Sequence, residues 1–233
     1  MRTLAVITTV CLAVHIQALD LPELKVAKVT RAPPKIDGVL DDEAWKQASQ
    51  AENFKLSEGE TPKGKCRLLI LQDDRNLYIA VECFEKEESL KALKADVTQH
   101  DGESIWEDDD VELFIDPTGK RDFPYYQLIF NSKGTTWDAY VQAAGDLDMA
   151  WEPKYEAKVK IGKESWRVEV ALPWSCFNRT EKSATQWAFN VSHVRSAGET
   201  LYWSPVFTDN SHTPEKFGKL LDMPARPLKE PNK

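Results

Sequence analysis

The chain has 233 residues, a formal net charge of −8 and an isoelectric point near 5.2. This acidity disfavours nucleic acid or an anionic membrane surface as a partner, and the sequence has no basic run interleaved with aromatic residues. The length suits one domain with a substantial core. Eight tryptophans are more than such a core obviously needs.

Residues 1–18 have the pattern of a secretory signal peptide. Arg2 supplies the positive charge, residues 4–14 form the apolar stretch, and residues 16–18 resemble a small-residue cleavage site. The apolar stretch is too short to cross a bilayer, and the rest of the sequence contains no candidate membrane span. We therefore expect a secreted or periplasmic protein.

The folded domain is expected to cover residues 19–222 and to begin with a strand at 25–30. Asp37 and Gly38 indicate a turn. Asp41 or Asp42 then caps one short N-terminal helix, in which Trp45 is predicted to plug the core. Residues 223–233 are rich in proline and lysine, and we expect a disordered tail there.

Short alternating segments separated by turn residues dominate the remainder of the chain. The clearest is 166–172, where Trp166 and Val168 alternate with Arg167 and Glu169. The expected strands cover 65–72, 77–84, 109–116, 125–131, 135–141, 154–161, 166–172, 187–194, 201–204 and 217–221. Many short strands without alternating amphipathic helices predict an all-β fold, an antiparallel β-sandwich of the jelly-roll type.

Two of the cysteines are placed to face each other. If Gln72 pairs with Leu77 across the hairpin, Cys66 lies opposite Cys83. Directly opposed residues in a non-hydrogen-bonded pair are about 4.5 Å apart at Cα, which is at the short end of the disulfide range. We predict a Cys66–Cys83 disulfide with Cys176 free. Three buried thiols that act as small apolar side chains are the alternative.

Residues 104–117 contain the most distinctive pattern. Trp106 precedes four acids at 107–110, and the following residues alternate, with Val111 on one face and Glu112 on the other. We expect a half-buried strand that ends at Pro117. An aromatic plate near a carboxylate suits a sugar ring, since the ring packs on the plate and its hydroxyls bond to the carboxylate. Alternatively, Trp106 belongs to the core and the acids form a solvated loop.

The motifs at 36–45 (IDGVLDDEAW) and 105–117 (IWEDDDVELFIDP) resemble carbohydrate-binding module family 9. Segments 166–174, 187–191, 202–205 and 217–220 fit the same family pattern in the same order. The resemblance implies a β-sandwich of the jelly-roll kind. It also implies a non-catalytic module that holds the end of a sugar chain between two tryptophans, with a glutamate on the hydroxyls.

Carried over to this chain, the resemblance assigns the tryptophans to Trp106 and Trp203 and the glutamate to Glu112. Asn190, His193 and Arg195, on the strand before Trp203, are the expected polar partners of the ring oxygens. The expected ligand is a mono-, oligo- or polysaccharide. Its affinity should be micromolar or weaker, because a small polar ligand makes few contacts. The sequence leaves the sugar and the oligomeric state open.

Three further possibilities remain at this stage. Some family members carry structural calcium, for which Asp37, Asp108 and Asp116 have suitable oxygens; no other cofactor is expected. Similar sandwiches bind haem b for electron transfer, and Met149 is the candidate axial ligand here. A glycosidase would need two carboxylates at a defined separation, and no pair stands out from the spacing. Family members often accompany glycosidases in polysaccharide catabolism.

Overall fold

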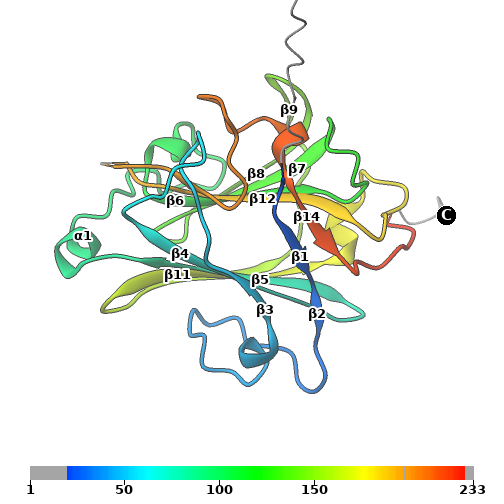
Figure 1. Cartoon of the computed structure of the whole chain (residues 1–233), viewed down its shortest axis with the longest axis horizontal. Helices are drawn as coiled ribbons and strands as arrows, with labels where there is room; N and C mark the ends of the chain where they lie inside the picture. The colour runs from blue at the N-terminus through cyan, green and yellow to red at the C-terminus, as the bar shows by residue number, and fades with distance from the viewer. Residues whose placement is uncertain (1–19, 197, 229–233) are drawn as a thin grey trace, which may run out of the picture.

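The structure is a computed structural model that describes residues 20–196 and 198–228, so the predicted signal peptide lies outside the described residues. Two β-sheets stack face to face, and Figure 1 shows them edge-on as an upper and a lower layer. A β-sandwich is therefore confirmed. Both sheets are mixed rather than purely antiparallel, because β1 pairs with β14, and β2 with β4, in parallel.

The upper sheet has eight strands in the order β1-β14-β12-β6-β7-β8-β9, with β13 beside β12. Their bounds are β1 Glu23–Lys25, β6 Asp110–Asp116, β7 Tyr125–Asn131, β8 Thr136–Ala143, β9 Asp146–Asp148, β12 Trp187–Val194, β13 Leu201–Tyr202 and β14 Gly218–Leu221. The lower sheet has six strands in the order β10-β11-β5-β4-β2, with β3 beside β4. Their bounds are β2 Ala27–Lys28, β3 Ser49–Ala51, β4 Lys65–Gln72, β5 Asn76–Phe84, β10 Glu156–Ile161 and β11 Ser165–Pro173.

In residues 20–196 and 198–228, helical structure is limited to short segments. One α-helix, α1, covers Glu87–Lys91. The 3-10 turns are η1 Trp45–Gln47, η2 Ile105–Glu107, η3 Trp174–Phe177 and η4 Pro214–Lys216. Among the described residues, no helix is long and apolar enough to cross a membrane.

The main core fills the space between the sheets. Val111, Leu113 and Ile115 of β6 point into it together with Trp166 of β11 and Trp187 of β12. The outer faces are covered as well, so every residue of β6 is buried. The prediction of a half-buried strand was therefore wrong in this respect, because loops cover the face expected to meet solvent.

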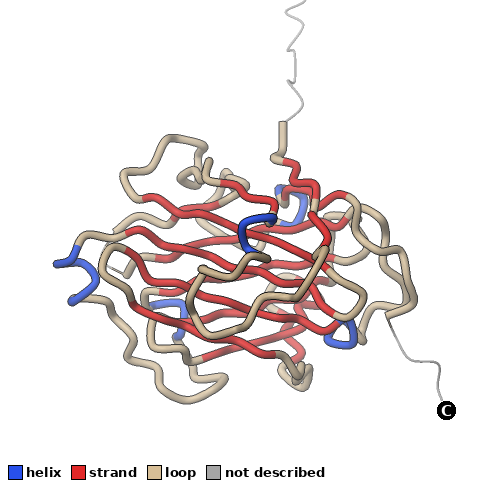
Figure 2. The backbone as a smooth tube through the Cα atoms, turned by 90° about the horizontal axis from the view of Figure 1, so that it is seen from below, coloured by secondary structure: helices blue, strands red, loops and turns tan. Residues whose placement is uncertain are grey.

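The N-terminal segment lies across the outer face of the lower sheet, as Figure 2 shows from below. The expected helix is reduced to η1, and Trp45 packs on that outer face rather than between the sheets. Glu169 of β11 fixes the segment. Its carboxylate accepts hydrogen bonds from the amide of Asp37 (3.0 Å), the amide of Gly38 (2.5 Å) and Trp45 Nε1 (2.7 Å). The 36–45 motif is thus explained by a structural contact.

Residues 223–228 are not a free tail. Met223 and Leu228 are buried in the core, and the amide of Leu228 donates to the carbonyl of Glu181 at 3.0 Å. The amide of Ser183 likewise donates to the carbonyl of Arg226. The disordered tail predicted from residue 223 is corrected over this stretch, because the apolar side chains at 223 and 228 anchor it.

Candidate functional site

The second and third members of the four-acid run, Asp108 and Asp109, are structural carboxylates. Asp108 accepts hydrogen bonds from the amides of Asp96 (2.8 Å) and Val97 (3.2 Å). Asp109 accepts from the amide of Lys94 (2.6 Å) and from Ser196 Oγ (2.9 Å). These bonds hold segment 94–97 against the start of β6, so both acids are committed to the fold.

Asp110 and Glu112 differ, because they alternate onto the outer face of β6 and few protein groups meet them. Asp110 is fully buried, and neither of its carboxylate oxygens has a hydrogen-bond partner in the described part of the chain. Glu112 is 5% exposed and accepts one bond from Ser192 Oγ at 3.1 Å. Oε1 of Gln127, from the adjacent strand β7, also lacks a partner among the described residues. Each unpartnered buried group costs about 1–3 kcal/mol.

Burial changes the charge of these two carboxyls. It raises the pKa of Glu112 to about 7, against the smaller opposing effect of the Ser192 hydroxyl. Burial, followed by repulsion from Glu112, raises the pKa of Asp110 well above its ordinary value. The pair therefore keeps at least one proton near neutral pH, so it offers both a donor and acceptors to a ligand.

Aromatic side chains lie on both sides of these carboxyls. Trp106 in η2 is 48% exposed and packs edge-to-face on Trp137 of β8, with ring centroids 6.4 Å apart. Trp137 pairs with Ile129, which pairs with Glu112, so two strand spacings (about 10 Å) separate Trp137 from Glu112 across the sheet. On the other side, Tyr202 pairs with Ser192 in β12.

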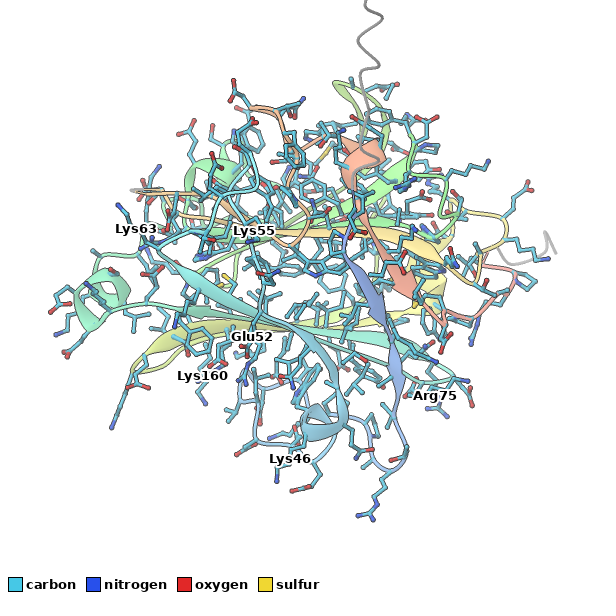
Figure 3. All side chains as sticks on the ribbon, in the orientation of Figure 1. Lys46, Glu52, Lys55, Lys63, Arg75 and Lys160 are labelled. Atoms are coloured by element: carbon cyan, nitrogen blue, oxygen red, sulfur yellow. The ribbon has the colours of Figure 1, made fainter. Side chains whose placement is uncertain are left out.

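Tyr202 is held in place by the segment 52–55, which connects the lower sheet to the upper sheet. Figure 3 shows this segment rising from Glu52, near the lower sheet, to Lys55 beside the upper one. Lys55 and Tyr202 exchange two backbone hydrogen bonds of 2.8 and 2.7 Å. Burial raises the pKa of Tyr202, and the charges of Glu112 and Asp110 add to this effect.

We call this group of residues the outer-face site: Trp106, Asp110, Glu112, Gln127, Ser192 and Tyr202. Two of its members, Trp106 and Glu112, were predicted from the sequence as site residues. The other four, Asp110, Gln127, Ser192 and Tyr202, were not. Strand alternation could have assigned Ser192 to the face of Asn190, but the register between β6, β7 and β12 was needed to bring them together.

Trp203, the expected second plate, lies on the core side of the upper sheet. It is 4% exposed and packs against Phe189, with ring centroids 5.7 Å apart. Tyr202, its neighbour in sequence, is the residue that shares a face with Ser192. In this structure Trp203 therefore does not face Trp106.

The three expected polar partners also have structural contacts. Asn190 is fully buried and exchanges two 2.9 Å hydrogen bonds with the backbone of Ser204, which ties the following segment to β12. His193 points into the core, with Nδ1 3.2 Å from Cys66 Sγ. Arg195 forms an ion pair with Glu85 through contacts of 2.7 and 2.9 Å. The structure does not bring these three to one binding surface.

The cysteine register is confirmed, but the bond is absent. Cys66 pairs directly with Cys83 across β4 and β5, as Gln72 pairs with Leu77. Both are nevertheless free thiols, like Cys176. Because the Cys66 thiol contacts His193 instead, the predicted disulfide is corrected for this structure.

The other suggested ligand residues have protein partners of their own. Asp37 bonds to Lys35 Nζ and to the amide of Val39. Asp116 accepts from the amides of Thr118 and Arg121. Met149 packs against an apolar cluster around Trp137.

Comparisons with known proteins give a consistent assignment. The chain is 24% identical over 206 residues to endo-1,4-beta-xylanase A of Thermotoga neapolitana and 23% identical to that of Thermotoga maritima. These matches cover 87% of the chain but only 18% of each xylanase.

Solved structures share the fold. A family 9 carbohydrate-binding module from Caldicellulosiruptor kristjanssonii in complex with cellotriose has a TM-score of 0.61 and 17% identity, covering 86% of this chain and 93% of that one. A family 9 module from the same organism in complex with glucose gives a TM-score of 0.59 and 16% identity, covering 86% of this chain and 95% of that one. A profile described as carbohydrate family 9 binding domain-like matches residues 36–221. The chain thus belongs to the carbohydrate family 9 binding domain-like family.

Proposed function

We propose that the protein is a secreted, non-catalytic module that binds a saccharide at the outer-face site. The observation that carries the proposal is that buried acceptor atoms of Asp110 and Gln127 have no partner among the described residues, on the same face as the exposed Trp106. A ligand with several hydroxyls would satisfy these atoms. Family membership supports the same class of ligand.

The chemistry of a sugar matches both parts of the site. The C–H face of a pyranose packs on a broad, electron-rich indole, and Trp106 offers such a surface. Its hydroxyls can donate to Glu112, Asp110 and Gln127, and charge-assisted bonds of this kind are the stronger ones. The proton kept by the carboxyl pair can be donated to a ring or glycosidic oxygen.

Glu112 is nearly closed to solvent, so a sugar that reaches it must displace the side chains around it. Tyr202 is the nearest aromatic on one side, and beyond the buried residues Trp203 and Ser204 the segment at 205–213 rises over the upper sheet, in orange in Figure 1. We therefore expect this segment to move on binding, which keeps the affinity modest.

We further propose a ligand of the glucose or cello-oligosaccharide class. The structural relatives were solved in complex with glucose and with cellotriose, and the xylanases matched by the chain are much longer than it. In this proposal the module directs a separate glycosidase to its polysaccharide.

Titration calorimetry with glucose, cellotriose and a xylo-oligosaccharide tests the proposal. Trp106→Ala and Glu112→Gln should each weaken binding at least about tenfold, the loss of about 1.4 kcal/mol. Phe84→Ala is the matched control, because it removes an exposed aromatic from the lower sheet and should leave affinity unchanged. Unchanged affinity in both site variants would exclude the outer-face site.

Glycoside hydrolysis is the second candidate. Asp110 and Glu112 are adjacent carboxyls on one strand face with raised pKa values, as an acid catalyst requires. Incubation with cello- and xylo-oligosaccharides, followed by product analysis, separates the two functions. Shortened products that disappear in Glu112→Gln would favour hydrolysis.

A further inference from the structure

A second polar cluster lies at the start of β8, outside the outer-face site. Its members are His100, Asp101 and Asp138, whose donor atoms all lie within 4.8 Å of one another. His100 Nε2 is 3.6 Å from Asp101 Oδ2 and 3.8 Å from Asp138 Oδ2. Glu152 adds a third carboxylate, with Oε2 3.4 Å from the same nitrogen.

The protonation of His100 is set by its other ring nitrogen. Nδ1 lies 2.8 Å from the hydroxyl oxygen of Thr136 and 3.0 Å from its carbonyl oxygen. Because the carbonyl can only accept, the tautomer that satisfies it carries the hydrogen on Nδ1. In the neutral ring, the lone pair of Nε2 therefore faces three carboxylates. Such an arrangement is repulsive unless a proton or a cation lies between them.

Asp138 supplies an independent indication of a missing partner. It is 1% exposed, and its Oδ1 has no hydrogen-bond partner within the described chain. Burial, followed by repulsion from Asp101, raises the pKa of Asp138 to about 7. A buried carboxylate in this condition is costly, and a bound cation would remove the cost.

We propose that His100, Asp101, Asp138 and Glu152 bind a divalent cation of the Zn²⁺ class. Zinc bonds of about 2.0–2.2 Å to nitrogen and oxygen at tetrahedral angles place the donor atoms about 3.4 Å apart. The three distances from His100 Nε2, 3.4, 3.6 and 3.8 Å, are close to this spacing. Glu152 is not among the donor atoms that lie within 4.8 Å of one another, so its side chain, which is 63% exposed, would turn toward the ion to complete the geometry. The bond from Nδ1 to the Thr136 carbonyl is the support that metal-binding histidines typically have.

The cation would join two parts of the chain that carry aromatic residues. His100 and Asp101 precede η2, which contains Trp106, whereas Asp138 directly follows Trp137. Trp106 and Trp137 pack against each other. Occupation of the cluster would therefore fix the segment that carries Trp106 to β8. The cation site does not depend on the proposed sugar binding.

A protonated His100 is the alternative occupant of the same space. Burial lowers the pKa of His100, but Asp101, Glu152 and Asp138 outweigh this effect and raise it. An imidazolium would form ion pairs with the carboxylates and bind no metal. The two states are distinguishable because only the neutral ring accepts a cation.

The test is titration of chelator-treated protein with Zn²⁺ at pH 7.5, followed by Co²⁺ as a spectroscopic probe. We expect one equivalent of Zn²⁺ to bind, and His100→Gln and Asp138→Asn to weaken it at least about tenfold. Glu103→Gln removes an equal charge from the same loop and should change the affinity less than about twofold. The His100 side chain is 46% exposed, so His100→Gln should fold even if Asp138→Asn does not.

Three results would overturn the proposal. The first is the absence of Zn²⁺ binding, which would leave the imidazolium ion pairs as the explanation. The second is binding that survives His100→Gln, or binding of Ca²⁺ that is tighter than that of Zn²⁺. The third is a thiolate charge-transfer band in the Co²⁺ spectrum, which would place the metal at Cys66, Cys83 and His193 instead.

Discussion

Replacing Trp203 should lower the stability of the protein, whereas replacing Trp106 should lower its affinity for a saccharide. Trp203 is 4% exposed and packs against Phe189, and a Cβ added at Gly218 would lie 2.7 Å from its ring. Tight packing of this kind leaves a cavity when the ring is removed, so Trp203→Ala should lower the free energy of unfolding by about 3–5 kcal/mol.

Trp106→Ala should cost much less stability. About half of the Trp106 surface is already exposed, so the buried part is roughly 100 Å² and its removal costs at most about 2.5 kcal/mol. Its effect should fall on saccharide binding instead, because the exposed indole is the surface available to a sugar ring.

Urea unfolding followed by circular dichroism gives the stability of each variant, and calorimetry with cellotriose gives the affinity. The expected pattern is a large loss of stability in Trp203→Ala and a large loss of affinity in Trp106→Ala. If Trp203→Ala unfolds like the wild type and no longer binds sugar, the indole is a binding plate and its placement in the core is refuted.

Three other predictions concern buried groups. Because the pKa of Glu112 is raised from 4.5 to about 7, the folded state holds a proton that the unfolded state releases over this range. The free energy of unfolding should therefore fall by on the order of 1–3 kcal/mol between pH 4.5 and 7. Glu112→Gln should flatten this dependence of stability on pH. A profile that rises over this range would contradict the burial of the carboxyl. Glu169→Gln should cost about 1–3 kcal/mol in urea unfolding, because an amide group would face the donors of Asp37, Gly38 and Trp45; a neutral result would mean that the 36–45 segment is held by packing alone. Alkylation in denaturant without reductant should label Cys66, Cys83 and Cys176, each a free thiol; protection of the first two would indicate the disulfide.

The sandwich could be predicted from sequence because the strand signals are local. The alternation in 65–72, 125–131 and 187–194 gave bounds that agree with β4, β7 and β12. The β4–β5 register followed from one assumed pair, since Gln72 opposite Leu77 fixes Cys66 opposite Cys83. Short hairpin turns leave little freedom for another register.

What covers each outer face could not be predicted, because it depends on contacts between residues far apart in sequence. The acid run is the clearest example. Asp108 and Asp109 bind amides of segment 94–97, so they are buried structural groups rather than a solvated loop. Glu169 was predicted to lie on the polar side of a half-buried strand, yet its carboxylate accepts a hydrogen bond from the amide of Asp37 in the turn.

The site was predictable only in part for a related reason. Trp106 and Glu112 share a motif, and the structure places them on the same side of the upper sheet. The assignment of Trp203 required knowing which of two adjacent aromatics, Tyr202 or Trp203, faces outward. Side chains alternate between the two faces of a strand, so an error of one residue in the strand register exchanges the outward and inward positions of Tyr202 and Trp203.

The most direct test of saccharide binding at the outer-face site is a titration with cellotriose monitored by the indole N–H signals of the tryptophans in a ¹H–¹⁵N spectrum. The indole signals of Trp106 and Trp137 should shift, while those of Trp203 and Trp187, which lie in the core between the sheets, should not. Shifts at Trp203 with none at Trp106 would contradict binding on the outer face.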